Sequence, residues 1–487
     1  MATVAAAMAR RTVTAGAAWA LGATTSAPMV VLVGGIVATY AGSEVTALPL
    51  LFALVGGVVT LLLVGYAAMV RAVPHSAPYY AITARGLGPT AGVGAGFVAL
   101  LAYNALQISL YGLFGAIMSG ITGIGAWWVF SAVAIGVVTV LGTRRIVLST
   151  QIVMGVLILS LLVVGLFVVV GFLDPADGIP AAAFDPAGLS VPGLGLAVAL
   201  TLAAYTGPEG MAAFIEEEDS AAGKRGQQIS RGMMICALSL IGVYTAAAWA
   251  MQSATGSGEV AAAAAADSNL PITILSDQVH PAFGILGVVI LVLAILTSLI
   301  SFHNIINRYA FAMSREQVLH QYLYRTGAGT AADAPVGASR AQNALAAVVV
   351  LVWAVSGADP QTTLFGWAST VGAMGLLALL IVSAAAALRY FARNADSGES
   401  GWNTTVAPLF GLAFGLAILV TMLLQLDALV GAKPGSLAPY ALPALLVVAA
   451  LAGIWRAAVL RRSKPQVYEG ISHGVPSVYA VPDRIDL

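Results

Sequence analysis

The sequence predicts an all-α polytopic membrane protein with twelve transmembrane helices. Its 487 residues are 60% hydrophobic and 9% charged, with a mean hydropathy of +0.94. Soluble proteins are roughly 45–50% apolar and about 25% charged, so water is not the main solvent of this chain. Apolar runs of about 20 residues recur with almost no charge inside them, and an α-helix needs that length to cross a bilayer. The strand-length alternation of outer-membrane barrels is not found.

The spans are expected to follow one another from residue 17, with edges that are soft by several residues. The first apolar run is too long for a signal peptide and lacks a convincing cleavage site, so we expect it to be a retained helix. The single cysteine, Cys236, excludes an intrachain disulfide. The expected spans are 17–40, 46–70, 91–120, 124–142, 146–173, 192–215, 228–253, 282–313, 340–357, 360–391, 404–426 and 437–460.

Basic side chains are distributed very unevenly over the connections between these spans. If the amino terminus is cytoplasmic, all of the 21 Lys and Arg residues except Lys433 fall on the cytoplasmic side. This is the distribution that the positive-inside rule predicts, and adding or removing one span would reverse part of it. We therefore expect a multi-pass protein of the inner (cytoplasmic) membrane with both termini in the cytoplasm.

Two spans contain helix breakers in the middle of their apolar runs. Residues 22–28 read Gly-Ala-Thr-Thr-Ser-Ala-Pro, and residues 205–210 read Tyr-Thr-Gly-Pro-Glu-Gly. Proline removes a backbone donor and glycine loosens a helix, which a membrane tolerates only where protein or a water-filled cavity serves the freed groups. The two spans are five apart, as two inverted five-helix repeats would place them. Two ordinary proline kinks are the alternative.

Glu209 is the only acidic side chain inside an expected span. An ionisable group in the hydrocarbon region is costly and points to function. It can accept from a substrate ammonium, carry a proton or bond to the broken backbone, whereas the alternative is a structural carboxylate that ties the sixth span to a neighbour.

Other classes of function have little support. No phosphate-cradling P-loop occurs, so ATP-driven transport by this chain alone is not expected, and no His-Glu-x-x-His or nucleophile-base motif indicates an enzyme. No filter motif of a channel stands out. A channel or a transporter-derived sensor stays open as a remote alternative.

Three segments resemble the amino acid/polyamine/organocation permease superfamily. Residues 205–209, followed by 216–218 and 224–229, resemble its sixth-helix signature, although the Asn-Pro of the cytoplasmic turn is missing. Residues 307–320 resemble its Arg-x-x-x-x-Met-Ala-Arg-Asp-Gly-x-Leu-Pro segment, and 103–112 resemble a version common among actinobacterial members. Residues 26–28 match the usual Gly-Ser-Gly more loosely.

The resemblance implies a LeuT-like fold of five plus five helices with helices one and six discontinuous. The first repeat would cover 17–173 and the second 192–391, followed by two peripheral helices in 404–460. Residues 1–16 and 463–487 would form the cytoplasmic ends. The implied substrates are amino acids, amines or polyamines, moved by alternating access.

The two breaks provide the predicted binding groups. Freed N–H groups around Thr25, Ser26 and Ala27 suit a carboxylate, and carbonyls near Tyr205 and Thr206 suit an ammonium. Polar residues of the third span share one face, either as part of the site or as links between helices. The predicted substrate-binding residues are Thr24, Thr25, Ser26, Ala27, Tyr103, Asn104, Gln107, Tyr205, Thr206, Gly207 and Glu209. With one acid available, a small zwitterionic amino acid is favoured over an amine or polyamine.

The coupling ion is predicted from what the fifth span lacks. The fifth span carries no lysine. In proton-coupled members of the resembled superfamily, a lysine in this helix can occupy the position that sodium takes in sodium-coupled members. Hydroxyl and carbonyl oxygens in the first and eighth spans suit a small cation, and the possible Na⁺ site is Gly22, Thr297, Ser298 and Ser301. A proton on Glu209 or His303, or exchange without any ion, is the alternative, and His303 has a packing role as its simpler interpretation. We expect no other cofactor, no nucleic acid partner, and a monomer or weak homodimer in the bilayer.

Overall fold

Long apolar helices make up most of the described part of the chain, which is residues 13–142, 146–191, 193–219, 225–327, 335–432 and 437–474 of the computed structural model. Ten of these helices are long and apolar enough to cross a membrane. The all-α prediction is confirmed, because the described residues form helices and no strand, with only isolated β-bridge positions such as the pair of Val13 and Glu218. Arg10, Arg11, Lys433 and the tail from residue 475 lie outside the described residues.

The helices follow the expected order, and short ones lie between the long ones. In chain order they are α2 (Ala15–Ser26), α3 (Pro28–Val30), a π-helical turn (Val31–Ile36), α4 (Val37–Gly42), α5 (Leu48–Ala72), α6 (Pro78–Leu87), α7 (Pro89–Thr122), α8 (Trp127–Gly142), α9 (Ile146–Leu173), α10 (Leu194–Ala204), the 3₁₀ helix η4 (Pro208–Glu217), α11 (Gln227–Thr255), α12 (Val260–Ala266), α13 (Leu270–Gln278), α14 (Ala282–Arg315), α15 (Val336–Ser356), the π-helical turn η7 (Pro360–Phe365), α16 (Gly366–Arg393), a π-helical turn (Trp402–Val406), α17 (Ala407–Leu424), α18 (Leu426–Leu429), α19 (Ala441–Ser463) and α20 (Pro465–Glu469). Four short 3₁₀ turns lie in the connections, at Ala181–Phe184, Pro186–Leu189, Gln321–Tyr324 and Ala438–Tyr440.

Two expected spans are not among the ten long helices. The fourth is α8, which has 16 residues. The sixth is divided into α10 and η4. The sequence did not predict α6, α12 and α13, which lie in connections between spans.

Burial differs strongly between the central and the peripheral helices. The first span is 89% buried over its most apolar window, whereas the corresponding values for α17 and α19 are 28% and 22%. Large apolar side chains such as Val355, Leu424 and Trp455 are exposed on the outer helices. Lipid covers such side chains in a bilayer, so the outer helices present an apolar surface while the first span lies in the protein interior.

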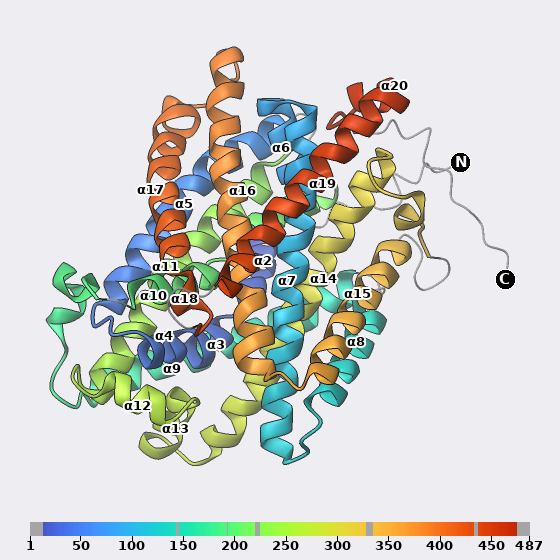
Figure 1. Cartoon of the computed structure of the whole chain (residues 1–487). Helices are drawn as coiled ribbons and strands as arrows, with labels where there is room; N and C mark the ends of the chain where they lie inside the picture. Colours follow the sequence, from blue (N-terminus) through green and yellow to red (C-terminus); the bar gives the residue numbers. More distant parts are fainter. Residues whose placement is uncertain are drawn as a thin grey trace.

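The two ends of the helix bundle are occupied by different short helices. Figure 1 shows α12 and α13 at one end, and α6 and α20 at the other. Arg71, Arg85, Arg315 and Arg393 lie in or next to the last turns of helices that end on the α6–α20 face.

A buried carboxylate attaches the C-terminal segment to the α6–α20 face. Glu316 follows α14, and its carboxylate accepts hydrogen bonds from His75 Nε2 (3.1 Å), the Tyr80 hydroxyl, and the N–H groups of Ser472 (2.9 Å) and Gly474 (2.8 Å). Burial raises the pKa of this carboxyl, but these donors outweigh burial and lower it to about 2. The segment after α19 is therefore tied to the end of α14.

Replacing Glu316 by Gln should release this segment. Hydrogen bonds to a charged acceptor contribute about 1.5–3 kcal/mol each, so amide exchange of Ser472 and Gly474 should accelerate at least about tenfold by hydrogen–deuterium exchange. Glu469→Gln changes an exposed residue of α20 and should leave exchange unchanged. Because the folded-state pKa is lowered from 4.5 to about 2, the stabilisation should be complete near neutral pH and decline as the pH falls through that interval. Equal exchange in both variants would contradict this role.

Candidate functional site

The first span is interrupted between Ser26 and Pro28. Helix α2 ends at Ser26, and Ala27 has the left-handed backbone angles φ 54° and ψ 73°. Proline disfavours the helical conformation of the residue before it, so Pro28 explains why the helix stops here. The N–H of Ala27 donates to the carbonyls of Ala23 (2.9 Å) and Thr24 (3.1 Å). It is therefore not a free donor, unlike the sequence-based expectation for this position.

The sixth span is interrupted at Gly207. Helix α10 ends at Ala204, Gly207 has φ 136°, and the 3₁₀ helix η4 starts at Pro208. The N–H of Gly207 donates to Glu209 Oε2 at 2.9 Å, whereas Glu209 Oε1 is buried and has no partner among the described residues. The Glu209 carboxyl group thus binds the broken backbone, which is one of the roles the sequence suggests for it.

The two interruptions are pressed against each other. A Cβ atom on Gly207 would lie 2.7 Å from the carbonyl oxygen of Gly22 and 3.0 Å from Ser26 N. A Cβ atom on Gly22 would lie 3.4 Å from Pro208 Cα. Ser26 Oγ donates to the carbonyl of Ala204 at 2.6 Å and also bonds to the Tyr244 hydroxyl. The approach of the two backbones therefore requires glycine at position 207, whereas a Cβ atom at position 22 would be only tightly packed.

Helix α14 joins the same junction. Ser298 Oγ donates to the carbonyl of Thr25 at 2.9 Å, so a carbonyl at the C-terminal end of α2 is satisfied from another helix. Thr297 Oγ1 bonds to carbonyls of its own helix, and Ser301 Oγ is buried without a partner among the described residues. The Ser298 hydroxyl of α14 and the Thr25 carbonyl of α2 are thus adjacent. Gly22, by contrast, contacts Gly207.

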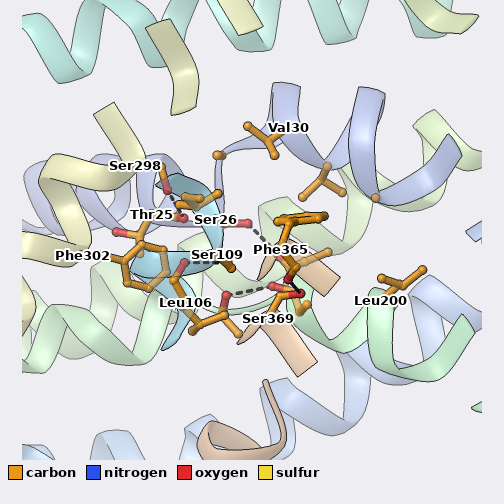
Figure 2. Close-up of a pocket in the computed structure, with 17 residues that line it drawn as sticks. Thr25, Ser26, Val30, Leu106, Ser109, Leu200, Ser298, Phe302, Phe365 and Ser369 are labelled. Atoms are coloured by element: carbon orange, nitrogen blue, oxygen red, sulfur yellow. Dashed lines mark hydrogen bonds between the residues drawn. The ribbon is translucent and has the colours of Figure 1, made fainter. Parts of the chain in front are cut away.

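A partly open cavity lies at this junction, and its empty space, including the part that is open to solvent, is about 600 Å³. Figure 2 shows Thr25 and Ser298 at one end of it and Leu200 at the other. The cavity-lining residues are Thr25, Ser26, Ala27, Val30, Val31, Gly35, Leu106, Ser109, Leu110, Leu200, Ala203, Ala204, Thr206, Ser298, Phe302, Phe365 and Ser369. Val30, Val31 and Gly35 follow the first break. Together with Leu200 and Phe365 they belong to the halves of their spans that lead to the α12–α13 face.

Ion pairs occupy the opposite side of the junction. Arg308 Nε lies 2.6 Å from Glu217 Oε1, and its guanidinium stacks over the Phe214 ring at 4.1 Å. Arg315 pairs with Glu216 at 3.2 Å. These contacts hold η4 against α14 between the cavity and the α6–α20 face.

The cavity includes part of the predicted binding set. Thr25, Ser26, Ala27 and Thr206 line it, and so does Ser298 of the possible sodium site. Thr24 is buried outside the lining, and Gly22 and Gly207 form the contact between the breaks. The hydroxyl of Tyr205 donates to the Phe52 carbonyl at 2.7 Å, so this side chain points towards α5.

The predicted polar face of α7 does not line the cavity. Gln107 donates to the Leu299 carbonyl at 3.1 Å and accepts from Gln342, which joins α7 to α14 and α15. Asn104 donates to Leu100 of its own helix, and Tyr103 packs against Phe302 and Tyr309. The contacts of Gln107 therefore fit its alternative role, a polar link between helices.

Sequence reasoning missed the apolar part of the lining. Leu106, Ser109 and Leu110 have the spacing of one helical face and lie within the 103–112 motif of the third span, so that face was a detectable alternative. Phe302 lies one turn after Ser298. No pattern around Phe365 and Ser369 indicated a site. His303 bonds through Nε2 to Ser339 Oγ at 3.0 Å, as a packing residue would.

Replacing Gly207 by Ala should disrupt the junction. The new methyl group meets the Gly22 carbonyl and the backbone must keep a positive φ, which together should cost roughly 3 kcal/mol or more. The thermal unfolding midpoint of purified protein should fall sharply. In Gly57→Ala, on α5, the methyl group meets nothing within 4 Å, so this variant should match the wild type. Equal stability of both variants would show that the close approach is not needed.

The sequence also matches a known protein family. Over residues 18–450 the sequence matches the model of a protein family described as "Amino acid permease". No curated protein matches the chain. The matched region contains both breaks and all the residues that line the cavity.

Proposed function

This chain belongs to the amino acid permease family, and we propose that it imports a small amino acid by alternating access. The observation that supports this most directly is the cavity at two interrupted helices that are pressed together, because an interrupted helix in a bilayer is tolerated where it lines a cavity. The family and the apolar helices together indicate a multi-pass membrane transporter of a small molecule.

The proposed architecture has twelve spans in two inverted repeats of five helices plus two peripheral helices. Adding α8 and the divided α10–η4 span to the ten long helices gives this number. The breaks in the first and sixth spans are the positions that such repeats relate. The likeness to actinobacterial members also stays a prediction.

The proposed orientation places the α6–α20 face in the cytoplasm of an inner membrane. The arginines at helix ends on this face support it through the positive-inside rule. The cavity then leads outward, and the ion pairs of Arg308 and Arg315 close the cytoplasmic side. Import would require these pairs to separate.

The proposed substrate is an amino acid with a small or apolar side chain. No charged side chain is among the described residues that line the cavity, and Leu106, Leu110 and Phe365 provide apolar wall. A polyamine needs acids for its distal charges, and the Glu209 carboxyl group is outside the lining. An amine permease of the same fold is the alternative.

Uptake by the purified protein in proteoliposomes tests the substrate and the cavity together. Radiolabelled alanine, valine or leucine should accumulate, whereas uptake of putrescine alone would replace the proposed substrate. Ala203→Phe fills the lining and should reduce uptake to near background without lowering the amount of folded protein. Ala413→Phe on the exposed side of α17 is the matched control and should transport normally. Normal uptake by Ala203→Phe would remove this cavity from the transport path.

Sodium is the proposed coupling ion, supported by the contact between Ser298 Oγ on α14 and the Thr25 carbonyl on α2. Ser301, three residues further along α14, adds a buried hydroxyl that has no partner among the described residues. A cation would share the Thr25 carbonyl with Ser298. Initial uptake rates should therefore fall at least about tenfold when choline replaces sodium at constant pH, a difference of about 1.4 kcal/mol. Ser301→Ala should raise the sodium concentration required for half-maximal uptake. Unchanged rates in choline would leave a proton or exchange as the mechanism.

A further inference from the structure

The segment that follows α19 lies across the α6–α20 face of the bundle. Residues 464–474, which include α20, form what we call the C-terminal strap, and Figure 1 shows α20 at the same end of the bundle as α6. Ile471 is only 1% exposed and belongs to the apolar core, and Val467 and Tyr468 pack against that core. The strap is therefore packed into this face of the protein.

One side of the strap is attached to α6 and α7. The guanidinium of Arg85 on α6 lies 2.7 Å from His473 Nε2, and because a guanidinium can only donate, the histidine nitrogen is the acceptor. The hydroxyl of Tyr468 bonds to the hydroxyl of Thr90 on α7 at 2.9 Å. These two contacts hold both the helical part of the strap and its last residues.

The other side of the strap is attached to the turn that follows α14. The N–H groups of Ser472 and Gly474 donate to the Glu316 carboxylate, and Lys464 Nζ donates to Gln317 Oε1 at 3.4 Å. Ser472 has a φ of 69°, a left-handed conformation that costs free energy in a residue other than glycine. The bond to Glu316 therefore stabilises a strained conformation, which makes the attached strap a state that can be released.

The end of α14 lies between the strap and the ion pairs that close the junction. Arg315 pairs with Glu216 of η4, and the next residue, Glu316, binds the strap. Arg308, about two turns earlier on the same helix, pairs with Glu217 of η4. One helix end thus carries both sets of contacts, and the position in which the strap fixes it is the position in which Arg315 reaches η4.

We propose that the C-terminal strap is an autoinhibitory contact, which holds the end of α14 against η4 and so restrains opening of the junction towards the α6–α20 face. The proposal concerns the regulation of the proposed transport cycle and rests on that function. In that cycle η4 has to separate from α14. A contact that forms in the closed state alone lowers the population of the open state, so release of the strap favours opening.

Ile471 allows the strap to be released without a change in α14. Ile471→Ala removes most of a buried side chain and should accelerate amide exchange of Ser472 and Gly474 at least about tenfold. Ile471→Val keeps most of the packing, and Gln466→Ala changes an exposed residue of α20, so both should exchange nearly as the wild type does. Glu316→Gln is a second way to release the strap. Unchanged exchange in both Ile471→Ala and Glu316→Gln would overturn the inference.

A thiol at position 305 reports whether η4 has separated from α14. A Cβ atom on Gly210 of η4 would lie 2.6 Å from Ile305 Cδ1, and Ile305 is fully buried. Ile305→Cys is therefore combined with Cys236→Ala, which removes the single native cysteine, and the purified full-length protein is treated with N-ethylmaleimide. Adding Ile471→Ala to this background should speed labelling at least about threefold, whereas Gln466→Ala should leave the labelling rate unchanged.

Labelling needs no substrate, so it separates this inference from the proposed function. Initial uptake of radiolabelled leucine into proteoliposomes should rise at least about twofold in Ile471→Ala, because the closed state is less populated. A released strap with an unchanged labelling rate would overturn the inference, and so would faster labelling with unchanged uptake. Faster labelling in a protein that transports no amino acid in any variant would support the strap as a closing contact while overturning amino acid transport.

Discussion

The contact between the backbones of Gly22 and Gly207 is the constraint on which the central structure depends. A Cβ on Gly207 would come within 2.7 Å of the Gly22 carbonyl oxygen, so any side chain there forces the two interrupted spans apart. Their approach brings Ser26 within hydrogen-bond distance of the Ala204 carbonyl and places Thr25 beside Ser298 on α14. The cavity forms where these three spans meet, because helices that stop short leave space that continuous helices would fill.

Interrupting a helix inside an apolar bilayer leaves polar groups that need partners. Here side chains of the protein bond to the backbone groups at the breaks. Glu209 accepts from the N–H of Gly207, Ser298 donates to the carbonyl of Thr25, and Ser26 donates to the carbonyl of Ala204. The residues that satisfy the breaks are therefore also the residues that line the cavity or lie directly behind it. This explains why a carboxyl group is retained within the sixth span, where an uncompensated one would be costly.

The sequence predicted the helical class, the order of the spans and the position of both breaks, because apolar run length and proline leave direct marks. It did not predict which face of α7 meets the cavity. Gln107 and Leu106 are adjacent in sequence but about 100° apart around a helix of 3.6 residues per turn, and only packing against α14 and α15 fixes the rotation. The polar side chains of α7 predicted a binding face. In the structure Gln107 instead bonds to Leu299 and Gln342, while Leu106 and Ser109 line the cavity. Phe365 and Ser369 carry no local signal, since their role arises from tertiary contact alone.

A cavity that is lined by hydroxyl and apolar side chains, with no charged side chain among the described lining residues, suits a protein that must release what it binds. Hydrogen bonds to a charged group contribute about 1.5–3 kcal/mol each, so hydroxyls can bind a charged end of a ligand without forming a desolvated ion pair. A ligand can shift a conformational equilibrium only by its difference in affinity for the two states. In the proposed cycle the opposing term is the closure of η4 on α14 through Arg308–Glu217 and Arg315–Glu216. The charge pairs thus lie in the closure, apart from the uncharged lining of the cavity.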